Sequence, residues 1–404
     1  MKQSGIDWIG EIPDDWNVNK IDSLYILRNT KVSDKDYPPL SVTMQGIVPQ
    51  LATAAKSDDG DNRKLVKKGD FAINSRSDRR GSSGVSDYDG SVSLINTILT
   101  PRGEMNPIYY NWLFHTIQFE DEFYKWGHGI VDDLWTTRWQ DMKNIFIVVP
   151  PKATQKRIAE YLDSKCAQID SIIEESKKSI EEYKAWKQSV IFEAVTGKLK
   201  NEKFSDKWEL IKIKYVAEYN TKTLPENTKD EFNFNYIDIG SVKFGEGITN
   251  FQNLNFKDAP SRARRIVKKD DVIISSVRTY LRAIARIEES EIPQIASTGF
   301  VVFSSKPQKI LPRFLFYAIS SESFVGKVEA NSVGISYPAI NASQIANFKI
   351  PLPPLPEQES IAKMLDSKCA QIDSLIAEKE SLIADLTEYK KSLIFEVVTG
   401  KRSI

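Results

Sequence analysis

The chain contains one segment twice, and this duplication limits its possible folds more than any other feature. The ten residues LDSKCAQIDS occur at 162–171 and again at 365–374. Around them, segments 150–198 and 353–401 align without a gap and share 27 of 49 residues. Both segments open with Pro-Pro, carry Gln at the sixth position and close with Val-Thr-Gly-Lys. Two copies separated by unlike sequences indicate an internally duplicated protein rather than a solenoid of many repeats.

Each copy of the repeat predicts one long helix. Positions spaced alternately four and three residues apart are mostly apolar, which is a heptad seam. The Pro-Pro step and the closing Thr-Gly bound about 40 residues, or roughly 60 Å of helix. A break at an N-cap near Asp163 or Asp366 is an alternative. An ordinary bundle helix is also compatible, but the length and strict seam favour a coiled coil. The seam residues expected to pair the helices or to dock a partner are Leu162, Ile169, Ile173, Ile180, Leu365, Ile372, Ile376 and Ile383.

The segments between the repeats resemble each other weakly. LVKKGDFAIN (65–74) aligns with IVKKDDVIIS (266–275), and each predicts a turn followed by a strand of branched residues. NPIYYNWLFHT (106–116) and LPRFLFYAISS (311–321) predict helices that begin at a proline. Residues 142–151 and 345–354 predict a last strand that runs into the Pro-Pro step. Each half is therefore expected to be one α/β domain followed by one long helix.

This order of segments predicts four parts. We expect recognition domains at 1–149 and 199–352, and helical regions at 150–198 and 353–404. If the helices pack together, an antiparallel arrangement is the economical one, because the second domain then starts and ends at the same end of the pair. The predicted fold class is α+β, with two α/β domains alternating with two long helices. The helices pair as an antiparallel coiled coil in a pseudo-twofold, circular arrangement.

Sequence motifs for catalysis or cofactor binding are not legible. The chain has two histidines and no HExxH, its two cysteines lack C-x-x-C spacing, and no G-x-x-x-x-G-K-[ST] occurs. NPIY (106–109) differs from the Asn-Pro-Pro-Tyr of adenine methyltransferases by its missing second proline. Cys166 and Cys369 fall on the helical seam and are expected to fill it. We therefore predict a binding protein with no catalytic residue, no metal and no cofactor.

Composition adds a weaker constraint. Net charge is zero, yet residues 199–352 hold 22 Lys/Arg against 17 Asp/Glu, and residues 1–149 hold 17 against 21. No apolar run reaches the roughly 18 residues of a membrane span, and the first residues show no signal peptide. We expect a cytoplasmic protein that does not contact a membrane.

Several basic loops rich in Gly and Ser predict contacts with nucleic acid. NSRSDRRGSSG (74–84), SRARR (261–265) and SSVRTYLR (275–282) combine arginines with small residues, which suits phosphate contacts and readout of guanine. Further hydrogen-bonding loops lie at 41–46, 127–138 and 331–344. For any single arginine, solvated surface is the competing interpretation. The candidate DNA-binding residues are Thr43, Gln45, Arg76, Arg79, Arg80, Arg138, Arg262, Arg264, Arg265, Arg278, Tyr280, Arg282, Tyr337 and Asn341.

The whole pattern resembles the specificity subunit of type I restriction–modification systems. The resemblance rests on WIGEIPDDW (8–16), on the step PP-x3-Q-x2-IA-x2-LD-x-K at 150–165 and 353–368, and on the VTGK ends. It covers the full chain, including the alternation of two domains with two helical regions. PPKATQ (150–155) departs from the more usual PPLPEQ (353–358), which puts one docking contact in doubt.

The resemblance implies partners that composition and spacing alone do not. Each domain would read one half of a split double-stranded DNA site, with the helices setting a spacer of under about 18 base pairs. The helices would also recruit two methyltransferase subunits, and restriction/translocase subunits would join them. A scaffold that binds only proteins, without salt-dependent DNA affinity, is one alternative. A self-sufficient modification enzyme that binds S-adenosylmethionine is another.

Overall fold

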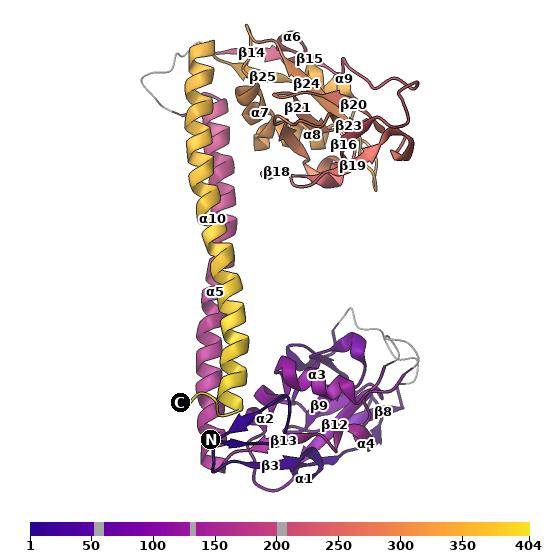
Figure 1. The fold of residues 1–404 in the computed structure, drawn as a ribbon, viewed down its shortest axis with the longest axis vertical. Helices are drawn as coiled ribbons and strands as arrows, with labels where there is room; N and C mark the ends of the chain where they lie inside the picture. The colour runs from indigo at the N-terminus through magenta and orange to yellow at the C-terminus, as the bar shows by residue number, and fades with distance from the viewer. Residues whose placement is uncertain (52–59, 130–134, 200–207) are drawn as a thin grey trace. The chain divides into compact units, whose positions relative to one another are not determined.

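The first α/β domain is built on two antiparallel sheets. The computed structural model describes residues 1–51, 60–129, 135–199 and 208–404 (Figure 1). The larger sheet of the first domain has the order β10 (Ser83–Val85), β9 (Phe71–Asn74), β12 (Asn96–Pro101), β4 (Tyr25–Leu27). The smaller sheet has the order β11 (Gly90–Val92), β8 (Arg63–Val66), β5 (Lys31–Val32), and β6 (Leu40–Thr43) forms a hairpin with β7 (Gly46–Pro49). The turn and strand predicted from LVKKGDFAIN are confirmed as the passage from β8 to β9.

An aromatic core covers one face of the larger sheet. Helix α2 (Pro107–Phe114) begins at a proline, as predicted, and the Asn106 side chain accepts hydrogen bonds from its first free amides. Helix α3 (Ile117–Lys125) follows at once, capped by Thr116. Phe114 packs against Phe71 of the sheet and Phe119 of α3, with ring centroids 5.0 and 4.5 Å apart. These contacts fix α2 and α3 on the sheet.

The first domain contains further short elements, of which the last leads into the long helix. They are β1 (Lys2–Gln3), β2 (Glu11–Ile12), β3 (Asn17–Lys20), α1 (Ile21–Leu24), η1 (Ser77–Arg79), α4 (Trp139–Met142) and β13 (Phe146–Val149). Strand β13 pairs antiparallel with β3 and runs into the Pro-Pro step, which confirms the predicted last strand.

The second domain repeats this framework with a different second sheet. Its first sheet has the order β22 (Ile284–Arg286), β21 (Val272–Ser275), β24 (Phe300–Ser305), β15 (Ala217–Tyr219), which matches β10-β9-β12-β4. Its second sheet has the order β19 (Gln252–Asn255), β16 (Asn233–Ile237), β23 (Gln294–Ser297), β20 (Ala263–Val267), in which β16 and β23 are parallel. The turn and strand predicted from IVKKDDVIIS are confirmed as the passage from β20 to β21.

Helices cover the first sheet of the second domain as in the first domain. Helix α7 begins at Pro312 and α8 follows directly, and both contribute buried residues to one core with β21 and β24. Strand β25 pairs with β14 before the second Pro-Pro step. These and the remaining elements of the second domain are β14 (Glu209–Lys212), α6 (Ile213–Val216), η3 (Ile239–Ser241), β17 (Val242–Lys243), β18 (Gly247–Ile248), η4 (Phe256–Asp258), η5 (Thr279–Leu281), α7 (Pro312–Ser320), α8 (Glu322–Ala330), α9 (Ala342–Asn347) and β25 (Lys349–Leu352).

Both repeats fold as single helices. Helices α5 (Lys152–Val195) and α10 (Leu355–Val398) have 44 residues each, and neither breaks near Asp163 or Asp366 (Figure 1). Gly197 and Gly400 follow their ends with φ near +74°, the left-handed conformation of a helix stop. The predicted long helices are confirmed.

The chain forms two compact units that divide both long helices. One unit is Met1–Lys177 with Glu380–Ile404, and the other is Lys178–Lys379. Each unit therefore contains one α/β domain, the first part of the helix that follows it, and the last part of the other helix. The predicted helical seam is largely buried: Leu162, Ile169, Ile180, Leu365 and Ile372 are buried, and Ile173, Ile376 and Ile383 are half-buried.

Candidate nucleic-acid interface

The short helix η5 carries a strained loop at the surface of the second domain. Arg278 and Arg282 flank it with φ of 49° and 51°, values that cost a side chain roughly 1–2 kcal/mol each. Thr279 Oγ1 donates to Ser332 Oγ at 2.9 Å, and the backbone bridges Val277 to Ala339. Strain that is held in place by such contacts is typical of binding loops.

Arg282 fastens this loop to helix α8. Its guanidinium donates to both carboxylate oxygens of Glu329, at 2.8 and 3.1 Å, and to Glu322 at 2.8 Å. The hydrogen bond to Glu329 raises the pKa of Arg282. Because two carboxylates neutralise this arginine, it positions the loop, and its predicted contact with DNA stays a prediction.

Arg278, Tyr280, Val333, Ile335 and Tyr337 form the tip of this interface, and all five side chains are exposed. Arg278 lies over the Tyr337 ring at 4.9 Å, and both side chains are exposed. Tyr280 is 54% exposed, and Val333 and Ile335 are almost fully exposed. Sequence reasoning missed Val333 and Ile335, because an isolated apolar residue in a loop carries no signal before its exposure is known. Apolar side chains of this kind suit the methyl group of thymine.

A groove of about 400 Å³ lies beside the tip. It brings together three elements that are distant in sequence: Asn220 after β15, Arg265 on β20, and Asn341 with Gln344 at the start of α9. Asn341 backbone N–H donates to Gln344 Oε1 at 3.1 Å, which fixes the helix start. The predicted candidates Arg265 and Asn341 thus share one groove.

Two neighbouring arginines do not line this groove. Arg264 stacks over the Phe256 ring at 4.9 Å, and Arg262 is exposed just before the strand begins. The register of β20 against β23 shifts between Ala263 and Arg265, and of these three arginines only Arg265 lines the groove.

In the basic loop of the first domain, every arginine lies near a carboxylate. Arg76 lies 3.0 Å from Asp78, whose other oxygen is 3.8 Å from Arg79. Arg80 forms an ion pair with Asp121 of α3 and lies over the Tyr124 ring at 5.3 Å. Arg79 is the most exposed of the three at 68%. It is the strongest candidate for a phosphate contact in this loop.

The other candidates of the first domain lie apart from that loop in sequence. Thr43 Oγ1 donates to Gly46 O at 2.9 Å and accepts from Gln45 N at 3.1 Å, so it shapes the β6–β7 turn while the Gln45 side chain is exposed. Arg138 is exposed at the start of α4. Residues 130–134 of the predicted 127–138 loop lie outside the described residues.

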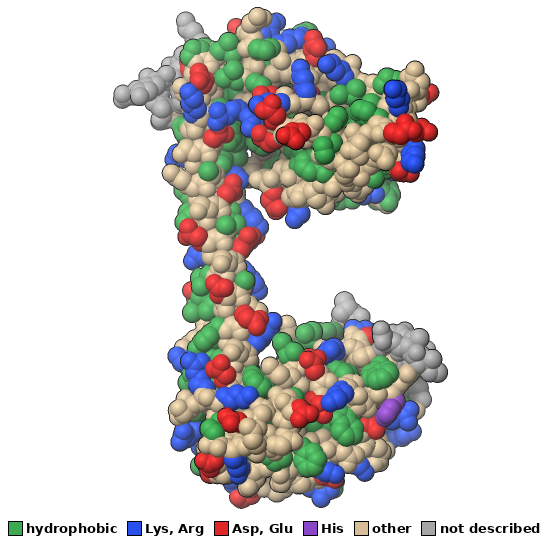
Figure 2. All heavy atoms as spheres, in the orientation of Figure 1, with side chains coloured by type: hydrophobic (Ala, Val, Ile, Leu, Met, Phe, Trp, Pro, Cys, Tyr) green, Lys and Arg blue, Asp and Glu red, His purple; other side chains and the backbone are tan. Residues whose placement is uncertain are grey.

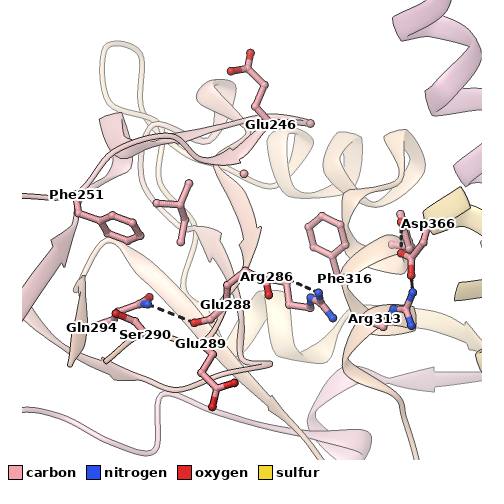
Figure 3. Close-up of a pocket in the computed structure, with 14 residues that line it drawn as sticks. Glu246, Phe251, Arg286, Glu288, Glu289, Ser290, Gln294, Arg313, Phe316 and Asp366 are labelled. Carbon is pink, nitrogen blue, oxygen red and sulfur yellow. Dashed lines mark hydrogen bonds and ion pairs between the residues drawn. The ribbon is translucent and has the colours of Figure 1, made fainter. Parts of the chain in front are cut away.

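On the visible face of each unit, charge does not segregate into one continuous basic band (Figure 2). Figure 2 shows basic and acidic side chains interspersed on the visible face of each unit. A cavity of about 540 Å³ beside β18 and α7 is also lined by side chains of both charges. In Figure 3 its arginines meet carboxylates: Arg313 pairs with Asp366, and Arg286 with Glu288 at 2.8 Å. With Glu246 and Glu289 also on its wall, this cavity does not suit phosphate.

The repeated helices contribute polar contacts that sequence reasoning missed. Gln155 Oε1 accepts from Asn106 N at 2.9 Å, and Gln358 Oε1 accepts from Leu311 N at 2.8 Å. Both glutamines are buried, and both also donate to the carbonyl of the first proline in their Pro-Pro step. Each therefore binds the start of the domain helix to the start of the long helix. The signal was the Gln kept at the sixth position of both copies.

The two aspartates in each LDSKCAQIDS have separate contacts. Asp163 accepts from Trp112 Nε1 at 2.8 Å, and Asp366 accepts from Tyr317 Oη at 2.6 Å, which ties each domain to its helix. Asp170 pairs with Lys390, and Asp373 with Lys187, all at 2.7 Å. Cys166 and Cys369 are buried as predicted, and burial raises the pKa of Cys166 to about 11.

Known proteins that resemble this chain share one description. Residues 205–383 match the type I restriction modification DNA specificity domain. The chain is 26% identical to the type I restriction enzyme MjaVIII specificity subunit of Methanocaldococcus jannaschii, over 96% of this chain and 93% of that relative. The chain is therefore similar to type I restriction specificity subunits. The EcoBI specificity subunit of Escherichia coli is 24% identical over 64% of this chain and 59% of its own length.

Solved structures of this family share the fold. One chain from a study of complex assembly and conformational transition of the type I restriction–modification system has a TM-score of 0.75 at 15% identity, covering 97% of this chain and all of its own. The HsdS subunit of Thermoanaerobacter tengcongensis has a TM-score of 0.59 at 16% identity, with both chains fully covered.

Two negative findings concern the described residues alone. Within residues 1–51, 60–129, 135–199 and 208–404, no helix is long and apolar enough to cross a membrane. Over the same ranges, no three His, Cys, Asp or Glu side chains gather where they could hold a metal ion.

Proposed function

We propose that this specificity subunit selects a bipartite DNA site, with one half-site read by each α/β domain at 1–149 and 199–352. The helical regions at 150–198 and 353–404 pair as an antiparallel coiled coil that sets the spacer. Their repeated outer surface docks two methyltransferase subunits, and restriction/translocase subunits join that complex. Methylation of DNA and its ATP-dependent cleavage reside in these partners.

One observation carries the proposal: the two copies of the repeat make matching contacts. Moving 17 residues toward the end of α5, from Asp170 to Lys187, moves the ion-pair partner 17 residues toward the start of α10, from Lys390 to Asp373. Opposite running directions are what an antiparallel pair requires. The two ion pairs also exchange under the repeat offset, which supports a pseudo-twofold arrangement with one docking surface per copy.

Helix length supports the role of spacer ruler. A helix of 44 residues spans about 66 Å, and one heptad adds about 10 Å, or three base pairs of DNA. We expect that seven residues inserted in register into both α5 and α10 lengthen the DNA spacer by about three base pairs. Both half-sites should stay the same, because the domains are untouched.

The test is selection of sites from randomised duplex DNA by the full chain, followed by sequencing. A matched control inserts seven residues into one helix only, which shifts the two seams out of register. Unchanged spacing after the paired insertion would contradict the role of the helices as a spacer ruler. If the unaltered chain selected no DNA at all, the alternative of a scaffold that binds only proteins would stand instead.

Salt dependence tests DNA contact by the η5 loop. Counterion release predicts that the logarithm of affinity falls steeply with the logarithm of salt concentration. Replacing Arg278 and Arg282 together with Ala should weaken binding and flatten that slope, while assembly with the methyltransferase subunits is retained. A single Arg278→Ala variant separates direct contact from loop positioning by Arg282. Unchanged affinity in the double variant would remove this loop from the interface.

A further inference from the structure

The groove beside η5 contains a cation without a counterion. Its lining includes Arg265, and among the described residues that line it there is no aspartate or glutamate. Arg265 Nε is buried and has no hydrogen-bond partner within the described ranges. Burial lowers the pKa of this guanidinium. A buried N–H without an acceptor is costly, so the groove lacks an electron-rich partner.

The neighbouring amides restrict the chemistry of that partner. Asn220 Oδ1 accepts from Val302 N at 2.9 Å, and Gln344 Oε1 accepts from Asn341 N at 3.1 Å. Both side-chain carbonyls are therefore engaged, and each amide keeps its NH₂ group for donation. Together with Arg265 the groove offers three donor groups. It fits a ligand edge that consists of acceptors.

Among the base edges of the major groove, guanine has this property. Its N7 and O6 are both acceptors, whereas adenine and cytosine each present an amino donor and thymine presents a single acceptor beside a methyl group. A phosphate also consists of acceptors, but exposed arginines such as Arg262 and Arg278 suit it better than a recessed guanidinium. We propose that Arg265 reads the major-groove edge of a guanine in the half-site bound by the second domain. This proposal rests on the proposed DNA-recognition function and deepens it.

The first domain has a lysine at the position equivalent to Arg265. LVKK at 65–68 aligns with IVKK at 266–269, which places Lys64 at the position of Arg265. Lys64 Nζ donates to Asn96 O at 2.7 Å, so this lysine binds the backbone of its own domain. The guanine contact is accordingly specific to one half-site.

The experiment is selection from randomised duplex DNA by the full chain carrying Arg265→Ala or Arg265→Lys. We expect preference for one guanine of one half-site to fall about 10- to 100-fold in Arg265→Ala, as for loss of a bidentate contact. Arg265→Lys keeps the charge but not the fork and should recover only part of the preference. The other half-site should be unchanged, which also reports that the variant is folded and bound.

Two controls separate base readout from phosphate binding. Arg262→Ala should weaken all sequences alike and lower the salt slope by about one. A duplex with 7-deazaguanine at the selected position lacks N7, so it should weaken the unaltered chain but not Arg265→Ala. A uniform loss in Arg265→Ala, or an unchanged guanine preference, overturns the inference. Failure of the unaltered chain to select any motif would instead overturn the proposed function.

Discussion

The helical repeats and the recognition domains have diverged in different ways. In the repeats, equivalent positions keep the same residue and the same contact: Gln155 and Gln358 bind domain helices, and Asp170 and Asp373 pair with lysines. In the domains, equivalent positions keep the backbone but change the contact, as Lys64 and Arg265 do. Identity is retained where the repeats bind the rest of the chain, and the contact at this domain position differs between the two halves.

The largest effect is expected from charge in the helical seam. Ile169 is 6% exposed and Ile372 is 1% exposed. Replacing both with Asp should cost about 3–5 kcal/mol at each site, because an ionised carboxylate loses its water without gaining a partner. Chemical unfolding of the full chain measures this loss, and selection of DNA with a fixed spacer should disappear.

Matched controls lie three residues further along each helix. Ile172 and Leu375 are 44% and 37% exposed, so Ile172→Asp and Leu375→Asp should change stability by less than about 1 kcal/mol. If half-site spacing and methyltransferase recruitment survived in the seam variant, the coiled-coil account would be wrong.

The buried glutamines should differ in degree. Gln358 donates to Lys309 O as well as to Pro353 O, whereas Gln155 donates to Pro150 O alone. Gln358→Leu should therefore cost about 2–4 kcal/mol, and Gln155→Leu about 1–3 kcal/mol, because each leaves buried backbone groups unpaired. Equal losses in urea unfolding would show that the third bond contributes nothing.

The closing glycines sharpen the comparison of the two repeats. Both have φ of +74°, but their surroundings differ. A Cβ on Gly400 would overlap Pro13 at 2.4 Å, whereas a Cβ on Gly197 would come no closer than 3.4 Å to Trp208. Gly197→Ala should cost about 1–2 kcal/mol from its backbone alone. Gly400→Ala should cost about 1–3 kcal/mol more, from overlap with Pro13 and Trp16. Thermal unfolding of the two variants side by side measures the difference.

The smallest expected effect concerns the paired lysines. Their carboxylate partners are about half exposed, so solvent screens both ion pairs. A double-mutant cycle on Asp170 and Lys390 should give a coupling of about 0.2–1 kcal/mol, and the cycle on Asp373 and Lys187 the same value. Couplings that differ by more than that range would break the equivalence of the two copies.

Sequence reasoning reached the fold because periodicity and duplication are local signals. The heptad seam predicts α5 and α10, and LVKKGDFAIN with IVKKDDVIIS predicts the β8–β9 and β20–β21 passages. The parallel pairing of β16 with β23 was out of reach, because it joins residues about 60 apart with no repeated motif. Long-range pairing depends on packing that no short window contains.

The interface was predicted less completely. Basic loops identify arginines, but not which of them meet carboxylates of another element. Arg282 pairs with Glu329, 47 residues away, and Arg80 pairs with Asp121, 41 residues away. Arg265 stood out only when its missing partner could be seen in the fold. Composition gives the charges, and tertiary structure decides which charges remain available.

Tyr109 Oη donates to Val398 O at 2.7 Å, so the last turn of α10 is held by a side chain from the first domain. This contact has a consequence for the order of biosynthesis. Lys178–Lys379 is continuous and can fold as soon as it leaves the ribosome, whereas the unit that starts with Met1 must wait for Glu380–Ile404. At roughly 5–20 residues per second, synthesis of the intervening segment takes about 10–40 seconds. The domain made first is therefore completed last, and during that interval its helix-docking surface is open to chaperones.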